Sequence, residues 1–275
     1  MSEIWELMAR TEIPATRGTI AADLRALGLS DGDNVIVHSS IKSIGWVVGG
    51  APTVVQALID VVGDRGTIVT PSHSYGHTDP ASWTSPRVRE DWISLIRDTL
   101  PPFDPATTPT THMGRVVEVF RTWPGTLRSR HPDVSFCARG ANAEFVTANH
   151  TYEMSQGNGS PLARLYDLDG KILFIGVGYD RNTSFHLAEY RIDETPLRTT
   201  TTLVEENGAR EWKEFPQIEN MNDDWLRELG AAFEADNPDN KISVGRVGLA
   251  ECRLFSQRAA VDFAVGWLRE KWALA

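Results

Sequence analysis

The sequence predicts an α/β protein whose mixed sheet is flanked by helices and extended by an antiparallel hairpin. Three observations carry this prediction. Strand, helix and strand patterns follow one another between Val35 and Thr70, which indicates a βαβ unit and therefore parallel strands. Further short apolar runs then alternate with segments of helical period. Nearer the C-terminus, Asn207-Gly208 separates two β-rich runs, a strong pattern for a hairpin.

The first helix and the βαβ unit are predicted from the spacing of apolar residues and from the glycines near the ends of helices. Thr16–Gly28 is predicted as a helix because Ile20, Leu24 and Leu27 share one face and a glycine stands where the helix should end. The βαβ unit consists of a strand, a helix and a strand at Val35–Val37, Gly50–Val62 and Gly66–Thr70.

The next segment, Ser72–Thr111, is rich in Pro, Thr, Ser and Asp and is predicted as a long elaborated loop with one helix around Val88–Leu100. Loops of this length in a compact domain are often functional, and His73 and His77 are candidates to line a substrate cleft. Helices are then expected at Met113–Trp123, Ala143–Ala148, Pro161–Leu168 and Asn182–Ile192, with strands at Val134–Ala138 and Lys171–Val177.

The C-terminal part combines the hairpin with two amphipathic helices. Thr199–Val204 and Arg210–Phe215 are the predicted hairpin strands. The helices are expected at Asp223–Glu234 and Ser256–Trp272. We expect one domain over residues 1–275, with the elaborated loop at 72–111 and a C-terminal lobe from about residue 198.

Composition narrows the function classes. The net charge of −10 and the absence of a Lys/Arg cluster argue against nucleic-acid binding. An acidic surface suits a cationic ligand, although acidity for solubility alone is the more frequent reason for such a charge. No apolar run approaches the roughly 20 residues of a membrane span, and the N-terminus has no signal-peptide pattern. Cys137 and Cys252 form no CxxC pair. A cytoplasmic protein with free thiols, acting on no membrane, is therefore expected.

A polar segment, His38–Gly45, follows the first predicted strand. Its hydroxyls, Lys42 and backbone N–H groups suit phosphate oxygens, while a serine-rich helix cap is an equal alternative. It contains neither GxxxxGK[ST] nor GxGxxG. Two other segments have similar alternatives. Thr110–Arg115 can cap a helix or bind an anion, and Arg128–Pro132 can hold a phosphate through arginine or form a solvated turn.

The most informative segment runs from Gly176 to Glu189, from a strand end through a glycine turn into a helix. His186 and Glu189 are three residues apart and share one helical face, so the carboxylate can orient the imidazole as a general base. A buried, merely hydrogen-bonded histidine is the alternative. A metal site is disfavoured because H-x-x-E supplies at most two ligands and no HExxH is present.

Several motifs occur together in a specific order. They are His38-Ser39-Ser40-x-x-Ser43-x-Gly45, Pro102-Phe103-Asp104-Pro105-x-Thr107, Met113-Gly114, Arg128-Ser129-x-His131-Pro132, Ser160-Pro161 and His186-x-Ala188-Glu189. The ordered set resembles the aminoglycoside 3-N-acetyltransferase family from about Leu24 to Trp272.

This resemblance implies an α/β fold of that family, distinct from the GNAT acetyltransferases, and an acyltransferase linked to antibiotic resistance. Acetyl-CoA would be the donor and the 3-amino group of a 2-deoxystreptamine ring the acceptor, with direct attack and no metal. His186 and Glu189 match the catalytic pair. The residues that match the CoA-binding side are His38, Ser39, Ser40, Lys42, Ser43, Thr111, Met113 and Gly114.

An aminoglycoside carries several ammonium groups, so acidic side chains are expected in the acceptor cleft. The acidic candidates, chosen by loop position and charge, are Asp79, Glu153, Asp180, Glu205 and Asp224, and Tyr75 is the candidate for a ring-stacking wall. Asp180 could instead orient His186. The alternative functions are acetylation of another amine, a metal-dependent hydrolase and a non-catalytic CoA-binding protein. The chain is expected to be a monomer or a homodimer.

Overall fold

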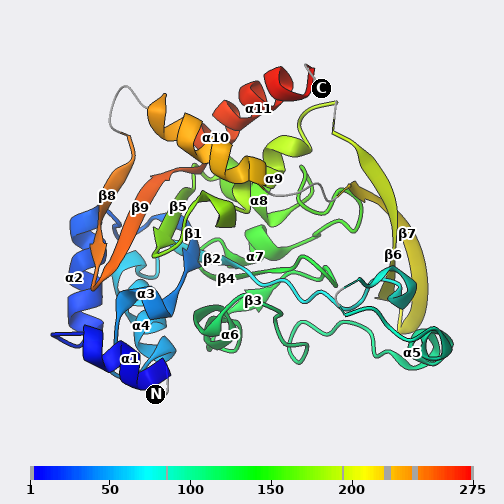
Figure 1. The fold of residues 1–275 in the computed structure, drawn as a ribbon, viewed down its shortest axis with the longest axis horizontal. Coiled ribbons are helices and arrows are strands. Elements are labelled where there is room, and N and C mark those ends of the chain that lie inside the picture. Colours follow the sequence, from blue (N-terminus) through cyan, green and yellow to red (C-terminus); the bar gives the residue numbers. More distant parts are fainter. Residues whose placement is uncertain (1–2, 85, 194, 220–223, 237–240, 274–275) are drawn as a thin grey trace.

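The computed structural model describes residues 3–84, 86–193, 195–219, 224–236 and 241–273, and in this part of the chain a seven-stranded sheet lies at the centre (Figure 1). Its strands are β1 (Asn34–Ser39), β2 (Thr67–Pro71), β3 (Leu127–Arg128), β4 (Phe136–Gly140), β5 (Lys171–Ile175), β8 (Ser243–Val247) and β9 (Ala250–Ser256). They are arranged in the order β3-β4-β2-β1-β5-β9-β8.

The sheet is mixed, as predicted. β1 lies between β2 and β5 and is parallel to both, which confirms the βαβ unit. β4 and β9 run antiparallel to β2 and β5. The central strands are buried on both faces, which explains why they are short continuous apolar runs in the sequence rather than alternating ones.

One face of the sheet is covered by helices from the first half of the chain. Val35 and Val37 point to this side and pack in a core with Leu24 and Val54. Thr16 accepts a hydrogen bond from the backbone N–H of Thr19 and caps the second helix, which ends at a left-handed glycine as its sequence predicts. The N-terminal helix and those of this layer are α1 (Glu3–Arg10), α2 (Arg17–Leu27), α3 (Ile41–Ile44), α4 (Ala51–Val62) and α6 (Arg115–Arg121).

The opposite face carries the second core. Ile36, Phe136 and Phe174 point to this side and contact the buried residues of later helices. These helices are α7 (Ala143–Thr147), α8 (Pro161–Asp167), α9 (Ser184–Glu189), α10 (Asp224–Ala235) and α11 (Gln257–Ala273). Among the described residues, no helix has both the length and the apolar character that crossing a bilayer requires.

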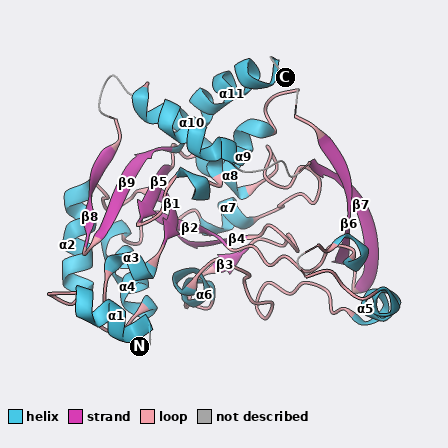
Figure 2. Ribbon diagram, in the orientation of Figure 1, coloured by secondary structure: helices cyan, strands magenta, loops and turns pink. Residues whose placement is uncertain are grey.

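A long hairpin stands apart from the sheet (Figure 2). Its strands, β6 (Leu197–Glu206) and β7 (Ala209–Ile218), are joined by Asn207-Gly208, where both residues have positive φ as a two-residue hairpin turn requires. The backbone N–H of Leu203 donates to His77 O (2.7 Å), which joins the hairpin to the loop after β2. That loop also carries η1 (Pro80–Ser82), η2 (Glu90–Trp92) and α5 (Ile93–Thr99).

The differences from the sequence-based expectations are local. α1 and the β8–β9 hairpin were not predicted, and β8 is mostly exposed, so it lacks the apolar run that marked the central strands. The helix expected over Asn182–Ile192 is the short α9, preceded by η3 (Tyr179–Arg181). Asp223, the first residue of a predicted helix, lies outside the described residues.

Candidate active site

His186 and Glu189 form a hydrogen-bonded pair on α9. The imidazole Nδ1–H donates to the Glu189 carboxylate, as the i, i+3 spacing predicts. The His186 side chain is 22% exposed, whereas that of Glu189 is 4% exposed. With the proton on Nδ1, the second ring nitrogen, Nε2, is an acceptor, which is the state that a general base needs.

The helix that carries this pair is fixed by its neighbours. Phe185 and Leu187 are fully buried in the second core. The Tyr190 hydroxyl donates to Gln217 Oε1 (2.9 Å), which ties the end of α9 to β7. The ring of Trp225 on α10 meets the His186 ring edge-on, with 6.1 Å between centroids. His186 is therefore held from three directions.

Two more histidines lie near the carboxyl ends of the central strands. His38 ends β1 beside Phe174, and His73 follows β2 beside Phe136. The pKa of each is lowered to about 3, by burial for His38 and, for His73, by burial together with nearby positive charges. Both rings are therefore neutral at pH 7. Within the described part of the chain, Nε2 of each has no hydrogen-bond partner, although it is buried.

These buried imidazoles affect stability. Burial lowers the pKa of His38, His73, His77, His131 and His150 below that of an ordinary histidine. The unfolded chain therefore binds protons near pH 6.5 while the folded chain does not, and stability is lost as the pH falls from 6.5 toward 3. We expect the free energy of unfolding to drop by roughly several kcal/mol between pH 7 and pH 5. Urea unfolding at pH 8, 6 and 5 measures it; an unchanged midpoint contradicts the prediction.

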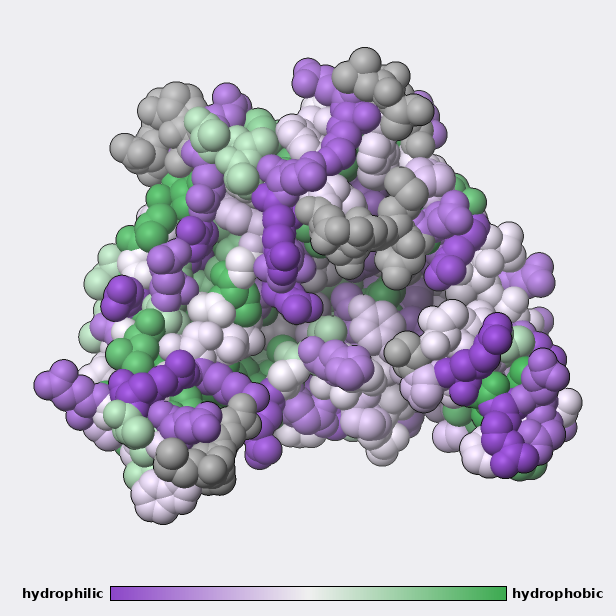
Figure 3. Space-filling model, in the orientation of Figure 1, coloured by the Kyte–Doolittle hydropathy of each residue, from purple (hydrophilic) through white to green (hydrophobic). Residues whose placement is uncertain are grey.

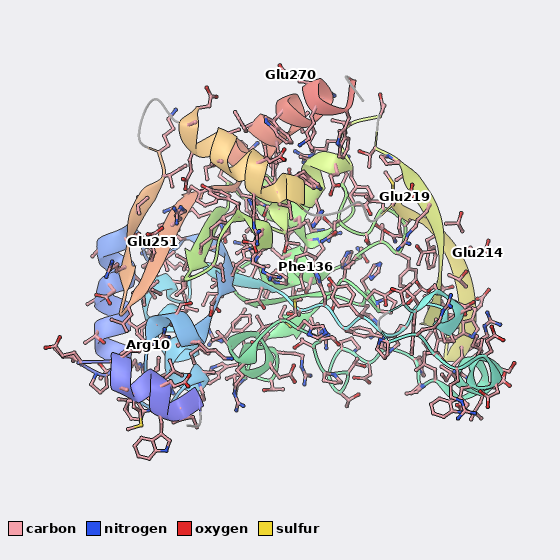
Figure 4. All side chains as sticks on the ribbon, viewed as in Figure 1. Arg10, Phe136, Glu214, Glu219, Glu251 and Glu270 are labelled. Atoms are coloured by element: carbon pink, nitrogen blue, oxygen red, sulfur yellow. The ribbon has the colours of Figure 1, made fainter. Side chains whose placement is uncertain are left out.

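A crevice lies where β1 and β5 end side by side. The chain leaves β1 toward one face of the sheet and leaves β5 toward the other, and such switch points are where open α/β sheets bind ligands. A cavity of about 560 Å³ is lined there by Arg10, Ser43, Gly176, Val177, Gly178, Leu249, Ala250, Glu251 and Arg253. Figure 4 places Arg10 and Glu251 on the same side of the molecule, with Phe136 near its centre.

Ser43 and Gly176 are neighbours in the lining of this cavity. Its hydroxyl donates to Gly176 O (3.1 Å), and Gly176 adopts φ +65°, where a Cβ would collide with Ser43. Ser40 occupies the N-cap position of α3, but its side chain makes no capping hydrogen bond. Lys42 is exposed, and its carbonyl accepts a hydrogen bond from Arg10. The helix-cap alternative for these serines is therefore not what the structure contains.

The second segment of the predicted donor side lies beside the first. A Cβ at Gly114 would be 4.0 Å from Ser39 O, so the two backbones approach each other closely. Thr111 does not cap α6: its hydroxyl donates to Ser74 O and its N–H donates to His73 O. Met113 is half-buried next to it.

Arg128 is a structural residue, so neither alternative for its segment applies to this arginine. It is 9% exposed, and its guanidinium donates to the carbonyls of Ser72 and Thr108 and to the hydroxyls of Ser74 and Ser135. All these partners belong to the chain, so this guanidinium neither holds a phosphate nor sits in a solvated turn. It fastens the loop after β2 to the start of β4.

The residues expected on the acceptor side are spread over several places. Tyr75 is 52% exposed and its hydroxyl is 2.9 Å from His73 Nδ1. Asp79 caps η1 and is paired with Arg97 at 2.7 Å. Asp180 is paired with Arg227 (3.4 Å) and Arg181 (3.5 Å), and the carboxylate hydrogen-bonded to His186 is that of Glu189. The side chain of Asp224 lies outside the described parts.

A second cavity, of about 800 Å³, lies between the hairpin and the loop after α7. It contains one of the expected acids, Glu153, and three that were not expected. Its lining is Asn149, His150, Thr151, Tyr152, Glu153, Glu206, Glu211, Trp212, Lys213, Glu214 and Phe215. Glu205 lies outside this lining, whereas its neighbour Glu206 belongs to it.

The two cavities lie on opposite sides of the buried centre. Figure 4 shows Glu214 at the outer edge of the hairpin, across Phe136 from Arg10 and Glu251. Figure 3 shows the surface hollowed near the middle of this face, between the sheet and the hairpin. Among the described residues, no group of three or more His, Cys, Asp or Glu side chains could hold a metal ion.

The family of the chain follows from comparison with known proteins. Residues 36–269 match the family described as Aminoglycoside 3-N-acetyltransferase. The chain belongs to this family. It is therefore an acetyltransferase, and acetyl-CoA is the co-substrate. The predicted resemblance and fold are confirmed.

Individual members of the family cover nearly the whole chain. The aminoglycoside N(3′)-acetyltransferase-like protein YokD of Bacillus subtilis is 44% identical over 263 residues, 95% of each chain, and its crystal structure superposes with a TM-score of 0.92. Aminoglycoside N(3)-acetyltransferase VII of Streptomyces paromomycinus is 37% identical, over 96% of this chain and 95% of its own. The structure of AAC-IIIb binary with CoASH has a TM-score of 0.84 at 31% identity and covers 94% of this chain and 98% of its own.

Proposed function

We propose that the chain transfers the acetyl group of acetyl-CoA to the 3-amino group of the 2-deoxystreptamine ring of aminoglycoside antibiotics, by direct attack with His186 as the general base. The observation that carries this is the His186–Glu189 hydrogen bond, with a half-buried imidazole over a buried carboxylate. The names of its relatives support the acceptor class.

The proposed reaction has two proton movements. His186 Nε2 takes a proton from the acceptor ammonium, and the freed lone pair attacks the thioester carbon, so that a C–N bond forms and the carbonyl electrons move to oxygen. His186 gives this first proton to solvent, and its Nε2 then takes the second proton from the nitrogen of the tetrahedral intermediate. When the oxyanion collapses, the C–S bond breaks and CoA leaves as a thiolate, which a protonated His186 can neutralise. The ionised Glu189 carboxylate stabilises the imidazolium between these steps.

The donor is proposed to bind in the crevice at the ends of β1 and β5. The hydroxyl of Ser43, backbone groups and the guanidinium groups of Arg10 and Arg253 line a cavity there, beside the carboxylate of Glu251, and guanidinium and backbone N–H groups suit a phosphate-bearing ligand. The unpartnered, buried Nε2 of His38 fits a site in which a ligand supplies the missing partner. We propose that Ser39, Ser40 and Lys42, together with Thr111, Met113 and Gly114, contribute to this side.

The acceptor is proposed to bind between Tyr75 and the hairpin. The lining of the second cavity has four carboxylates, from Glu153, Glu206, Glu211 and Glu214, against the single ammonium of Lys213. Tyr152 and Phe215 stack beside them with 5.3 Å between centroids and supply an apolar surface for sugar rings. A polycationic ligand is attracted to such a wall through partly screened charges.

The test is acetyl transfer with purified protein. It is incubated with acetyl-CoA and a panel of aminoglycosides, and the release of free CoA thiol is followed. We expect release with drugs that contain 2-deoxystreptamine, and a KM for the acceptor that rises with salt because exposed carboxylates contribute to binding. Mass spectrometry then locates the acetyl group. If CoA thiol is released with another amine but not with these drugs, the acceptor belongs to that other class of amine. Hydrolysis of acetyl-CoA in the absence of any acceptor would contradict acetyl transfer.

A further inference from the structure

Asp133 places a buried carboxylate beneath the loop that carries Tyr75. The residue is 8% exposed and lies in the turn before β4. Its own N–H donates to His131 Nδ1 (3.2 Å), which fixes the turn. Oδ2 accepts a hydrogen bond from Thr202 Oγ1 (3.2 Å), and among the described residues Oδ1 has no partner of normal geometry. No step of the proposed reaction uses this group.

The loop after β2 folds around this carboxylate. Ser74 N donates to the backbone oxygen of Asp133 (2.9 Å), and hydrogen bonding from the backbone N–H groups of His77 and Gly76 lowers the pKa of its carboxyl. Between them Tyr75 adopts φ +36°, a left-handed conformation that a bulky side chain rarely takes. Such a conformation persists only where the surroundings enforce it. The contacts of Asp133 with residues 74–77 hold the loop in this conformation.

The same carboxylate also reaches the hairpin. Thr202 lies on β6, where Leu203 N donates to His77 O and Asp79 N donates to Thr201 O (2.9 Å). Thr202 and Lys213 are opposite each other in the hairpin ladder, so their side chains share the face that lines the acidic cavity. One carboxylate therefore touches both walls between which the acceptor is proposed to bind.

We propose that Asp133 is a positioning residue for the acceptor, which sets Tyr75 on one wall and the acidic hairpin on the other. This inference rests on the proposed function, because it needs the acceptor to lie between these walls. Asp133 itself does not touch the acceptor. It acts through the backbone of Gly76 and His77 and through the hydroxyl of Thr202.

The effect of Asp133 on the free energy of unfolding distinguishes a positioning role from a structural one. Burial raises the pKa of Asp133 to about 6, while its hydrogen bonds lower it. The titratable groups around it are His77 and His131, both neutral because burial lowers their pKa, and the Arg128 guanidinium, whose charge also lowers the pKa of His77. A carboxyl with a raised folded pKa favours the fold below about pH 4, and this contribution is lost as the pH rises to 6. At pH 7 the ion thus costs stability.

The experiment compares three variants of the full chain: D133N, T202V and, as the control, D104N. Asn keeps the size of Asp but cannot accept hydrogen bonds with both side-chain atoms. T202V removes only the contact with the hairpin. Asp104 accepts N–H groups of Ala106 and Thr107 in the same long loop, far along the chain from both walls. Steady-state kinetics, urea unfolding at pH 7 and hydrogen exchange measured by mass spectrometry are the readouts.

We expect D133N to raise the KM for the acceptor about tenfold, the scale of one charge-assisted hydrogen bond, with the KM for acetyl-CoA unchanged. Its unfolding midpoint at pH 7 should equal or exceed that of the wild type. Exchange should quicken in residues 74–79 and 197–206, whereas T202V should quicken exchange only in the hairpin and D104N should match the wild type in all readouts.

Two outcomes would overturn the inference. One is a D133N protein with an unchanged acceptor KM. The other is a D133N protein with a lowered unfolding midpoint and equal losses for both substrates, which is the behaviour of a structural group. A wild type that acetylates no amine would defeat the proposed function instead. The exchange of residues 74–79, which needs no substrate, would then still decide whether Asp133 holds this loop.

Discussion

Replacement of His186 by alanine is expected to lower kcat by about a hundredfold or more while the protein remains folded. An ammonium has no lone pair with which to attack the thioester, and in this variant no imidazole faces the acceptor to remove its proton. The half-buried ring makes few core contacts compared with its neighbours Phe185 and Leu187, so its loss should leave the fold intact. CoA thiol release under saturating substrates measures the effect.

The controls for this variant separate chemistry from binding. The affinity for acetyl-CoA and the urea midpoint should stay near the wild-type values, because the cavity proposed to bind the donor is lined by other residues. Added imidazole should restore part of the activity, since a small base can fill the space left by the ring. Turnover within threefold of the wild type in a folded His186→Ala protein would reject this residue as the base.

Elements fixed by neighbouring residues were predictable from the sequence. The helix α2 has its cap, its apolar face and its terminal glycine within one segment. The hairpin turn was predictable from the dipeptide Asn207-Gly208, whose φ values are both positive. His186 and Glu189 belong to the same class, because three residues of one helix separate them and helical geometry alone brings them together.

Contacts between distant segments were not predictable. Arg128 takes its hydrogen-bond partners from Ser72, Ser74 and Thr108, and nothing local distinguishes a buried guanidinium from an exposed one. Asp133 meets Thr202 only because the hairpin folds back onto the loop after β2. A single sequence carries no information on such pairings until the topology is known.

The acids of the second cavity illustrate a different limit. Charge and position predicted an acidic hairpin residue, and Glu205 was chosen, whereas Glu206 lines the cavity. A strand alternates faces at every residue, but the lining also holds consecutive residues of the paired strand, Glu211 to Phe215. The choice between Glu205 and Glu206 therefore depends on how the whole hairpin lies against the loop after α7, which the sequence does not show. The register here is set by pairing with Ala209 and Arg210, across the turn.

Replacement of Glu189 by glutamine is expected to lower kcat by up to about ten thousandfold, the scale that the wrong imidazole tautomer costs in a Ser-His-Asp triad. Glutamine has the size of glutamate, so the side chain stays in place. Its amide N–H can donate to Nδ1 of His186. The ring proton would then lie on Nε2, the nitrogen that must be unprotonated in order to accept a proton from the acceptor. The variant also lacks the negative charge that stabilises an imidazolium. Single-turnover and steady-state rates measure the loss.

The pH dependence distinguishes this role from simple support of the helix. If Glu189 stabilises a protonated ring, the acid limb of the pH–rate profile of Glu189→Gln should move to lower pH, while the plateau at high pH stays far below that of the wild type. A merely structural carboxylate would leave the position of the limb unchanged and lower the urea midpoint. Glu144→Gln, on the exposed side of α7, is the matched control and should do neither. A Glu189→Gln protein with a wild-type profile would show that His186 needs no carboxylate, and the pair would then lose its catalytic interpretation.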